Sequence, residues 1–131
     1  EGEERFRDVE EVVLGELTQH IVVVLSTGGG SVLRANNRKR LRECGPVVYL
    51  KSFPDELLRR LRHDTQRPLL QVADPLKRLR ELYTARDPLY RETAHFTIET
   101  GRPSVATLVN MIAMQLDLGG GERTRTPCSQ L

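Results

Sequence analysis

The sequence has no tryptophan, only two cysteines and three lysines among 131 residues, and no long apolar run. Two cysteines are too few for a disulfide framework, and their wide separation gives no metal-ligand spacing. No apolar run approaches the roughly 20 residues of a membrane span, and no signal-peptide pattern opens the chain. The sequence therefore predicts a protein of the reducing cytoplasm with no membrane partner.

Arginine carries almost all of the positive charge, with seventeen arginines against three lysines and a formal net charge of +2. Its forked guanidinium suits carboxylate and phosphate groups, although a general codon preference for arginine would give the same composition. The basic run from Arg38 to Arg42 would fit a nucleic-acid surface, but the nearly balanced charge and the 5% of aromatic residues argue against one. We therefore expect this run to be a solvated helix face and the protein to have no nucleic-acid partner.

Helical and strand-like segments alternate along the chain. Apolar spacing and helix-boundary residues predict helices over about residues 3–19, 31–43, 54–63 and 75–86, and another from Pro103. In the first of these helices the apolar positions are Val9, Val12, Val13, Leu14 and Leu17. Short apolar runs predict strands at 21–25 and 47–50, and such runs are typical of a parallel sheet covered on both faces. A last strand is predicted at 96–99. The alternation predicts one α/β domain with a parallel sheet and right-handed crossovers.

Two segments interrupt this pattern. Residues from about 64 to 74 carry turn and breaker residues without periodicity between two helices, which predicts a mobile lid. Residues 119–131 begin with three glycines and predict a disordered tail. The folded domain is therefore expected to span residues 1–118.

A triple glycine, Gly28 to Gly30, closely follows the apolar run at 21–25 and precedes a predicted helix. Glycines at such a turn let main-chain N–H groups approach an anion or a hydroxyl closely, and the following helix start points its free donors the same way. A strand-to-helix turn that needs positive φ would give the same sequence. On these residues alone both interpretations remain open.

Four motifs in this order closely resemble those of shikimate kinase. They are Phe6-Arg7-Asp8-Val9-Glu10, Ser26-Thr27-Gly28-Gly29-Gly30, Arg67-Pro68-Leu69-Leu70 and Arg86-Asp87-Pro88-Leu89-Tyr90. The resemblance covers about residues 1–117 and implies a three-layer, parallel-sheet fold like that of nucleoside monophosphate kinases. It also implies transfer of the γ-phosphoryl group of ATP, with Mg²⁺, to the 3-hydroxyl of shikimate in chorismate biosynthesis, by a monomer.

The resemblance assigns the substrate side of the site to the glycine turn and two arginines. Arg7 and Arg86 match the arginines that hold the shikimate carboxylate. Gly29, with Gly28 and Gly30 beside it, matches the glycine whose N–H meets shikimate. Glu10 matches an acidic residue that orients Arg7, although from the sequence alone a solvated helix glutamate is an equal alternative.

On the nucleotide side the resemblance implies fewer residues. Arg67 matches the lid arginine that closes over the ATP phosphates, where its charge acts in catalysis. Arg102 is a candidate for contact with the adenine, as is Arg60. Ser26 and Thr27 would lie near the magnesium ion.

The chain also departs from that family, because it contains no G-x-x-x-x-G-K-[ST] sequence for the nucleotide phosphates and none of its lysines follows a glycine. The family's second strand, with its aspartates, is not found either. We therefore expect an incomplete fold without the first two strands, a split sheet, marginal stability or strands that rearrange to pair directly, and no activity by this chain alone. The alternative is a non-catalytic, shikimate-binding or regulatory protein.

Overall fold

The computed structural model describes residues 2–20, 24–61 and 73–120. In chain order the elements are α1 (Gly2–Leu17), the 3-10 helix η1 (Gly29–Leu33), α2 (Ala35–Cys44), β1 (Val48–Lys51), α3 (Pro54–Leu61), α4 (Pro75–Thr93), β2 (Phe96–Glu99) and α5 (Val105–Gly120). Within these ranges, none of the helices combines the length and the apolar character that a membrane crossing requires.

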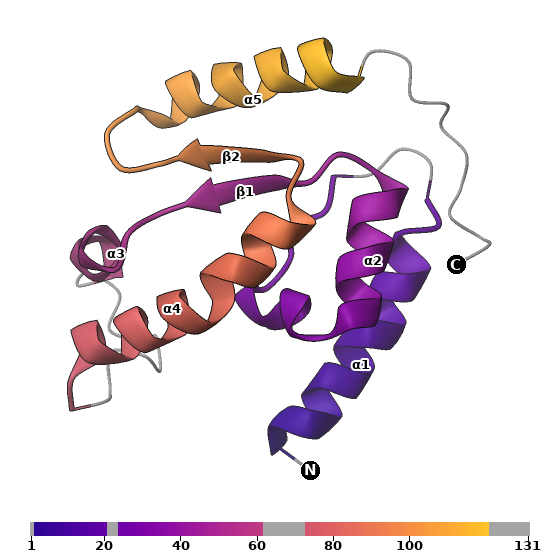
Figure 1. The fold of residues 1–131 in the computed structure, drawn as a ribbon, viewed down its shortest axis with the longest axis horizontal. Helices are drawn as coiled ribbons and strands as arrows, with labels where there is room; N and C mark the ends of the chain where they lie inside the picture. The colour runs from indigo at the N-terminus through magenta and orange to yellow at the C-terminus, as the bar shows by residue number, and fades with distance from the viewer. Residues whose placement is uncertain (1, 21–23, 62–72, 121–131) are drawn as a thin grey trace.

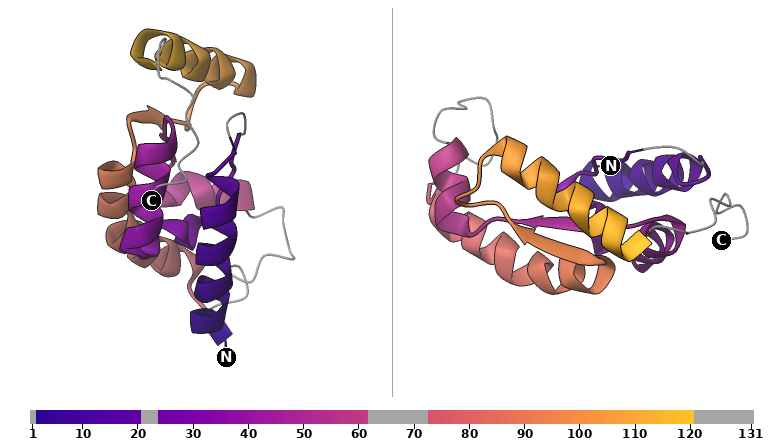
Figure 2. Two further views of the ribbon diagram at one scale, coloured as in Figure 1. Left: turned by 90° about the vertical axis from the view of Figure 1, so that its right-hand side faces the viewer. Right: turned by 90° about the horizontal axis from the view of Figure 1, so that it is seen from above.

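The two strands form a parallel pair, with Val48 opposite Phe96 and Lys51 opposite Glu99. Helix α5 lies on one side of this sheet and α4 with α2 on the other (Figure 1; Figure 2). This arrangement confirms the predicted three-layer α/β architecture with a parallel sheet. Strand β2 has the predicted bounds, and β1 begins one residue later than predicted.

Helix α4 is a full seven residues longer than the 75–86 that the sequence predicts, because it continues through Pro88 to Thr93. Asp74 caps its start by accepting a hydrogen bond from the Lys77 N–H at 3.1 Å, and Pro75 occupies the first turn. A proline inside a helix removes one hydrogen bond, so the prediction ended the helix too early. The extra two turns place Arg86 and Tyr90 on the same helix, one turn apart.

The start predicted for the helix at residues 31–43 is wrong. Residues 29–33 form a 3-10 turn, and α2 begins only at Ala35. The Ser31 N–H donates to the Gly28 carbonyl at 3.1 Å, which is the three-residue spacing of a 3-10 helix. The glycine turn is thereby the first part of η1, and its main chain is tightly wound.

Three other predicted segments, the strand at 21–25, the lid and the tail, lie wholly or partly outside the described residues. Of the strand predicted at 21–25, residues 21–23 lie outside the described residues, and Val24 and Leu25 are not in a strand. Most of the predicted lid, 64–72, and the tail from residue 121 also lie outside them, whereas α5 includes the first two residues of the predicted tail. Within the described part of the chain, no third strand pairs with β1. Rearrangement of the strands to pair directly stays a prediction, because residues 21–23 lie outside the described residues.

The apolar core is small. Among the residues that the structure describes, four apolar side chains are buried, Leu14, Val32, Leu79 and Ile98. The predicted apolar face of α1 is buried only at Leu14, while its other members, Val9, Val12, Val13 and Leu17, are exposed. The amphipathic helix is therefore present, but most of its apolar face is exposed, since nothing among the described residues covers α1 on that side.

Candidate functional site

The glycine turn is held in an ordinary backbone conformation. Gly28 has φ −67° and ψ 154°, and among the described residues only Gly2, with φ 40°, lies in the left-handed region. The interpretation of the triple glycine as a turn that needs positive φ is therefore wrong. Gly29 and Gly30 are instead needed for space: a Cβ at Gly29 would lie 3.1 Å from the Tyr90 hydroxyl and 3.3 Å from Nη1 of Arg86, and a Cβ at Gly30 would overlap Arg7.

Arg7 lies against the turn from the side of α1. Its guanidinium donates to Glu10 at 2.8 Å and to Glu3 at 3.2 Å, and a Cβ added at Gly30 would overlap it. The hydrogen bond to Glu10, more than that to Glu3, raises the pKa of Arg7 above its usual value. The side chains of Arg7 and Glu10 are each only 14% exposed, so this ion pair is well shielded from water.

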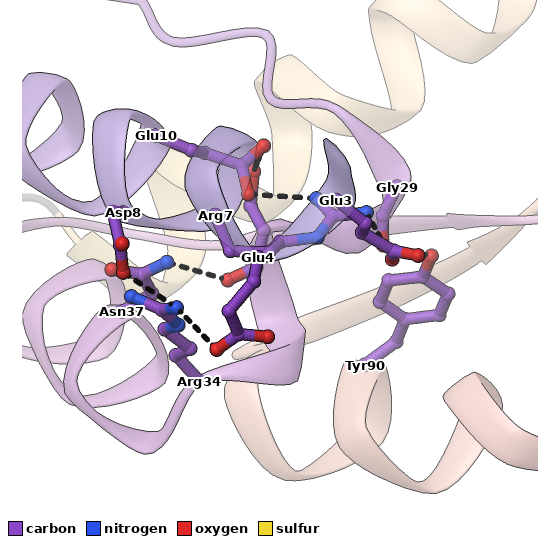
Figure 3. Close-up of polar contacts among 10 residues, drawn as sticks. Glu3, Glu4, Arg7, Asp8, Glu10, Gly29, Arg34, Asn37 and Tyr90 are labelled. Carbon is purple, nitrogen blue, oxygen red and sulfur yellow. Dashed lines mark hydrogen bonds and ion pairs between the residues drawn. The ribbon is translucent and has the colours of Figure 1, made fainter. Parts of the chain in front are cut away.

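Glu10 joins α1 to the glycine turn. One carboxylate oxygen accepts from Arg7, and the other accepts from the Ser31 hydroxyl at 3.1 Å (Figure 3). The alternative of a solvated helix glutamate is therefore wrong. Glu10 fixes the direction of Arg7, as a residue that orients a binding arginine must do.

Arg86 approaches the same turn from α4. No hydrogen bond or ion pair joins its guanidinium to the part of the chain that the structure describes, although the side chain is half-buried beside Gly29. Two guanidinium groups thus flank neighbouring glycines, Arg7 with its direction fixed by carboxylates and Arg86 with its donors available. Forked donors of this kind suit a planar carboxylate.

Tyr90 contacts the turn directly, and the sequence did not reveal this. Its hydroxyl donates to the Gly29 carbonyl at 2.5 Å (Figure 3). Its ring packs on Tyr49 with 4.9 Å between centroids, and the Tyr49 hydroxyl donates to Asp87 at 2.8 Å. Burial, and then the bond to Asp87, raises the pKa of Tyr49. The signal that could have found Tyr90 is its spacing of four residues from Arg86 on one helix.

Arg34 connects the segment after the turn to α1. It pairs with Asp8 at 2.8 Å and with Glu4 at 3.1 Å, and the hydrogen bond to Asp8 raises its pKa (Figure 3). Both carboxylates are exposed, so these pairs stabilise the fold little.

Asn37 of α2 holds the turn through a buried hydrogen bond. Its side chain is 1% exposed, and its amide donates to the Ser31 carbonyl at 3.0 Å. Replacement of Asn37 by alanine leaves that buried carbonyl without a donor, which costs about 1–3 kcal/mol. We expect amide hydrogen exchange over residues 29–33 to become roughly 5- to 150-fold faster in Asn37→Ala, measured by mass spectrometry.

The matched control for this prediction is Asn36→Ala, because Asn36 is the exposed neighbour on the same helix. It is expected to leave the exchange over residues 29–33 within about twofold of the wild type, as surface substitutions usually do. Equal acceleration in the two variants would show that the bond from Asn37 does not hold the turn.

Two of the residues predicted to serve the nucleotide, Arg60 and Arg102, lie apart from this cluster. Arg67 lies outside the described residues. Arg102 is exposed in the loop between β2 and α5, and Arg60 donates to the Thr100 carbonyl at 2.6 Å near that loop. Over the described ranges, no group of three or more His, Cys, Asp or Glu side chains could hold a metal ion. The structure thus brings together Arg7, Gly28 to Gly30 and Arg86, and leaves Arg102 apart.

Comparisons with known proteins point to one family. The sequence model of the shikimate kinase family matches residues 1–117. The chain is 59% identical over 120 residues to shikimate kinase of Burkholderia thailandensis, covering 92% of this chain and 65% of that protein. It is 51% identical over 124 residues to shikimate kinase of Thiobacillus denitrificans, covering 95% of this chain and 68% of that protein.

Solved structures agree with the sequence comparisons. Shikimate kinase from Acinetobacter baumannii in complex with shikimate matches with a TM-score of 0.80 and 46% identity, covering 93% of this chain and 68% of that one. Shikimate kinase from Bacteroides thetaiotaomicron matches with a TM-score of 0.76 and 29% identity, covering 89% and 69%. The chain spans about 65% of the length of the Burkholderia thailandensis relative.

Proposed function

The chain belongs to the shikimate kinase family, and we propose that its glycine turn, with Arg7 and Arg86 on either side, binds shikimate. The observation that carries this proposal is the pair of guanidinium groups at neighbouring glycines, one fixed by Glu10 and one with its donors available. The similar Acinetobacter baumannii protein was solved with shikimate bound. In this chain the two guanidinium groups would hold the carboxylate, and the main-chain N–H of Gly29 would meet a hydroxyl.

The proposed reaction of the family's site is transfer of a phosphoryl group from ATP to the 3-hydroxyl of shikimate, with Mg²⁺. The residues of this chain do not fit the phosphates and the metal, because the sequence has no G-x-x-x-x-G-K-[ST] motif and the described residues have no cluster of metal ligands. We therefore assign no step through the nucleotide. A lid role for Arg67 and an adenine contact for Arg102 stay proposals that rest on the family alone.

We infer that this chain by itself binds shikimate without phosphorylating it. Electrostatic stabilisation and positioning by the phosphate cradle and Mg²⁺ supply most of the catalysis in phosphoryl transfer. Without the phosphate-binding loop, the substrate side of the site keeps the groups that recognise shikimate, but no phosphoryl donor is held beside it. This inference also covers the alternative of a shikimate-binding protein without catalysis.

Calorimetric titration with shikimate and with its methyl ester tests the binding site. We expect shikimate to bind and the ester to bind at least about tenfold more weakly, because the ester lacks the charge that pairs with arginine. Arg86→Met should weaken shikimate binding roughly 10- to 100-fold, since charge-assisted hydrogen bonds are worth about 1.5–3 kcal/mol. Arg78→Met, an exposed arginine of the same helix, is the control. Equal affinity in the two variants would refute the site.

Release of ADP from MgATP in the presence of shikimate tests the absence of catalysis. We expect no shikimate-dependent release from this chain under conditions in which the Burkholderia thailandensis relative turns over. Turnover by the chain would show that it builds a phosphate site without the G-x-x-x-x-G-K-[ST] motif. The binding proposal would survive that outcome, whereas the proposal of an inactive chain would not.

A further inference from the structure

We propose that Tyr90 is a positioning residue of this site, whose hydroxyl fixes the peptide plane between Gly29 and Gly30 and so aims the main-chain donors of the turn. The inference rests on the proposed shikimate site. Tyr90 reaches the turn from α4, opposite the side from which Arg7 and Glu10 approach (Figure 3). The hydrogen bond from its hydroxyl to the Gly29 carbonyl measures 2.5 Å.

Because the peptide bond is planar, a contact with its carbonyl also orients its N–H group. The carbonyl and the N–H of one trans peptide point in opposite directions, so a donor that fixes the Gly29 carbonyl also fixes the Gly30 N–H. The preceding peptide is held in the same way, because the Ser31 N–H donates to the Gly28 carbonyl at 3.1 Å. Both peptides of the turn are thus held through their carbonyls, which leaves the direction of their N–H groups defined.

Glycine makes such an external contact necessary. A peptide between two glycines has no Cβ on either side to restrict its rotation, so its orientation must come from groups outside the turn. Nothing larger fits here, because a Cβ at Gly29 would lie 3.1 Å from the Tyr90 hydroxyl itself. The tyrosine therefore replaces the restriction that a side chain on the turn would provide.

Tyr90 is itself held by the sheet. Its ring packs on the ring of Tyr49 in β1, with 4.9 Å between centroids. Packed aromatic pairs have preferred geometries, so this contact defines the position of the Tyr90 hydroxyl. Arg86 precedes Tyr90 by one helical turn. The single helix α4 therefore positions the Arg86 guanidinium and also orients the peptide between Gly29 and Gly30.

The first test needs no ligand. Tyr90→Phe removes the hydroxyl that meets Gly29, and Tyr49→Phe removes the other hydroxyl of the stacked pair without touching the turn. In isotope-labelled full chain we expect Tyr90→Phe to shift the carbonyl ¹³C resonance of Gly29 and to lower the order parameter of the Gly30 amide, whereas Tyr49→Phe leaves both unchanged. Unchanged Gly29 signals in Tyr90→Phe would overturn the proposal, whether or not shikimate binds.

The second test compares shikimate affinity in the same two variants. Tyr90→Phe should bind shikimate about 5- to 10-fold more weakly than the wild type, and Tyr49→Phe should stay within about twofold. Wild-type affinity in Tyr90→Phe would overturn the positioning role even if the Gly29 signals move. A wild type that does not bind shikimate would refute the proposed function, while the ligand-free test would still decide whether Tyr90 orients the turn.

Discussion

Replacement of Gly30 by alanine is expected to weaken shikimate binding roughly 10- to 100-fold, because a lost charge-assisted hydrogen bond costs about 1.5–3 kcal/mol. A Cβ at this position would overlap the guanidinium of Arg7. Arg7 can move only by leaving Glu10, to which it donates at 2.8 Å, or Glu3 at 3.2 Å. The guanidinium that we propose as the fixed carboxylate ligand would thus lose its direction, and calorimetric titration with shikimate measures the loss.

Gly28→Ala is the matched control for this prediction. The Gly28 backbone is extended, which any residue can adopt, and its added Cβ would meet the nearest Glu10 oxygen at 3.6 Å, an ordinary contact. We expect this variant to bind shikimate within about twofold of the wild type, as a substitution that creates no clash usually does. A Gly30→Ala protein with unchanged affinity would show that the direction of Arg7 does not matter to the site.

Local patterns predicted the fold where local interactions decide it. The strand predicted at 96–99 is β2 with the same bounds, and the helix predicted by apolar spacing at 3–19 is α1. The prediction failed where the chain departs from a local rule. Helix α4 continues through Pro88, and the start of the helix predicted at 31–43 is a 3-10 turn held by Asn37. Apolar periodicity does not describe a bond from a polar side chain to the main chain such as that of Asn37.

The candidate site divides in the same way. Resemblance to the family supplied Arg7, Gly29 and Arg86, and the structure brings these residues together, although their roles in binding stay predictions. The contacts of Tyr90 and Asn37 join residues that are 61 and 6 positions apart and follow no periodic pattern. Resemblance transfers the residues that touch a ligand. The residues that hold those residues in place became visible only in the folded chain.

Low stability is expected for this chain, because its described part buries few apolar side chains. Leu14 is 5% exposed and is the only buried apolar residue of α1, whereas Val12 on the same helix is 63% exposed. Net stability of a domain is only about 5–15 kcal/mol, and a buried leucine cut to alanine costs about 2–5 kcal/mol. We expect the wild-type chain to be marginally stable and to bind a hydrophobic dye, and Leu14→Ala to lose its remaining tertiary structure.

Urea unfolding followed by circular dichroism, with dye fluorescence beside it, measures both expectations. Val12→Ala is the control, because its exposed side chain loses little burial, and we expect its unfolding curve to match that of the wild type. The dye should bind because the exposed apolar residues of α1 and α5 are not covered within the described ranges. A sharp cooperative transition at ordinary urea concentration, without dye binding, would contradict this account. Such a result would mean that the apolar faces of α1 and α5 are covered in solution.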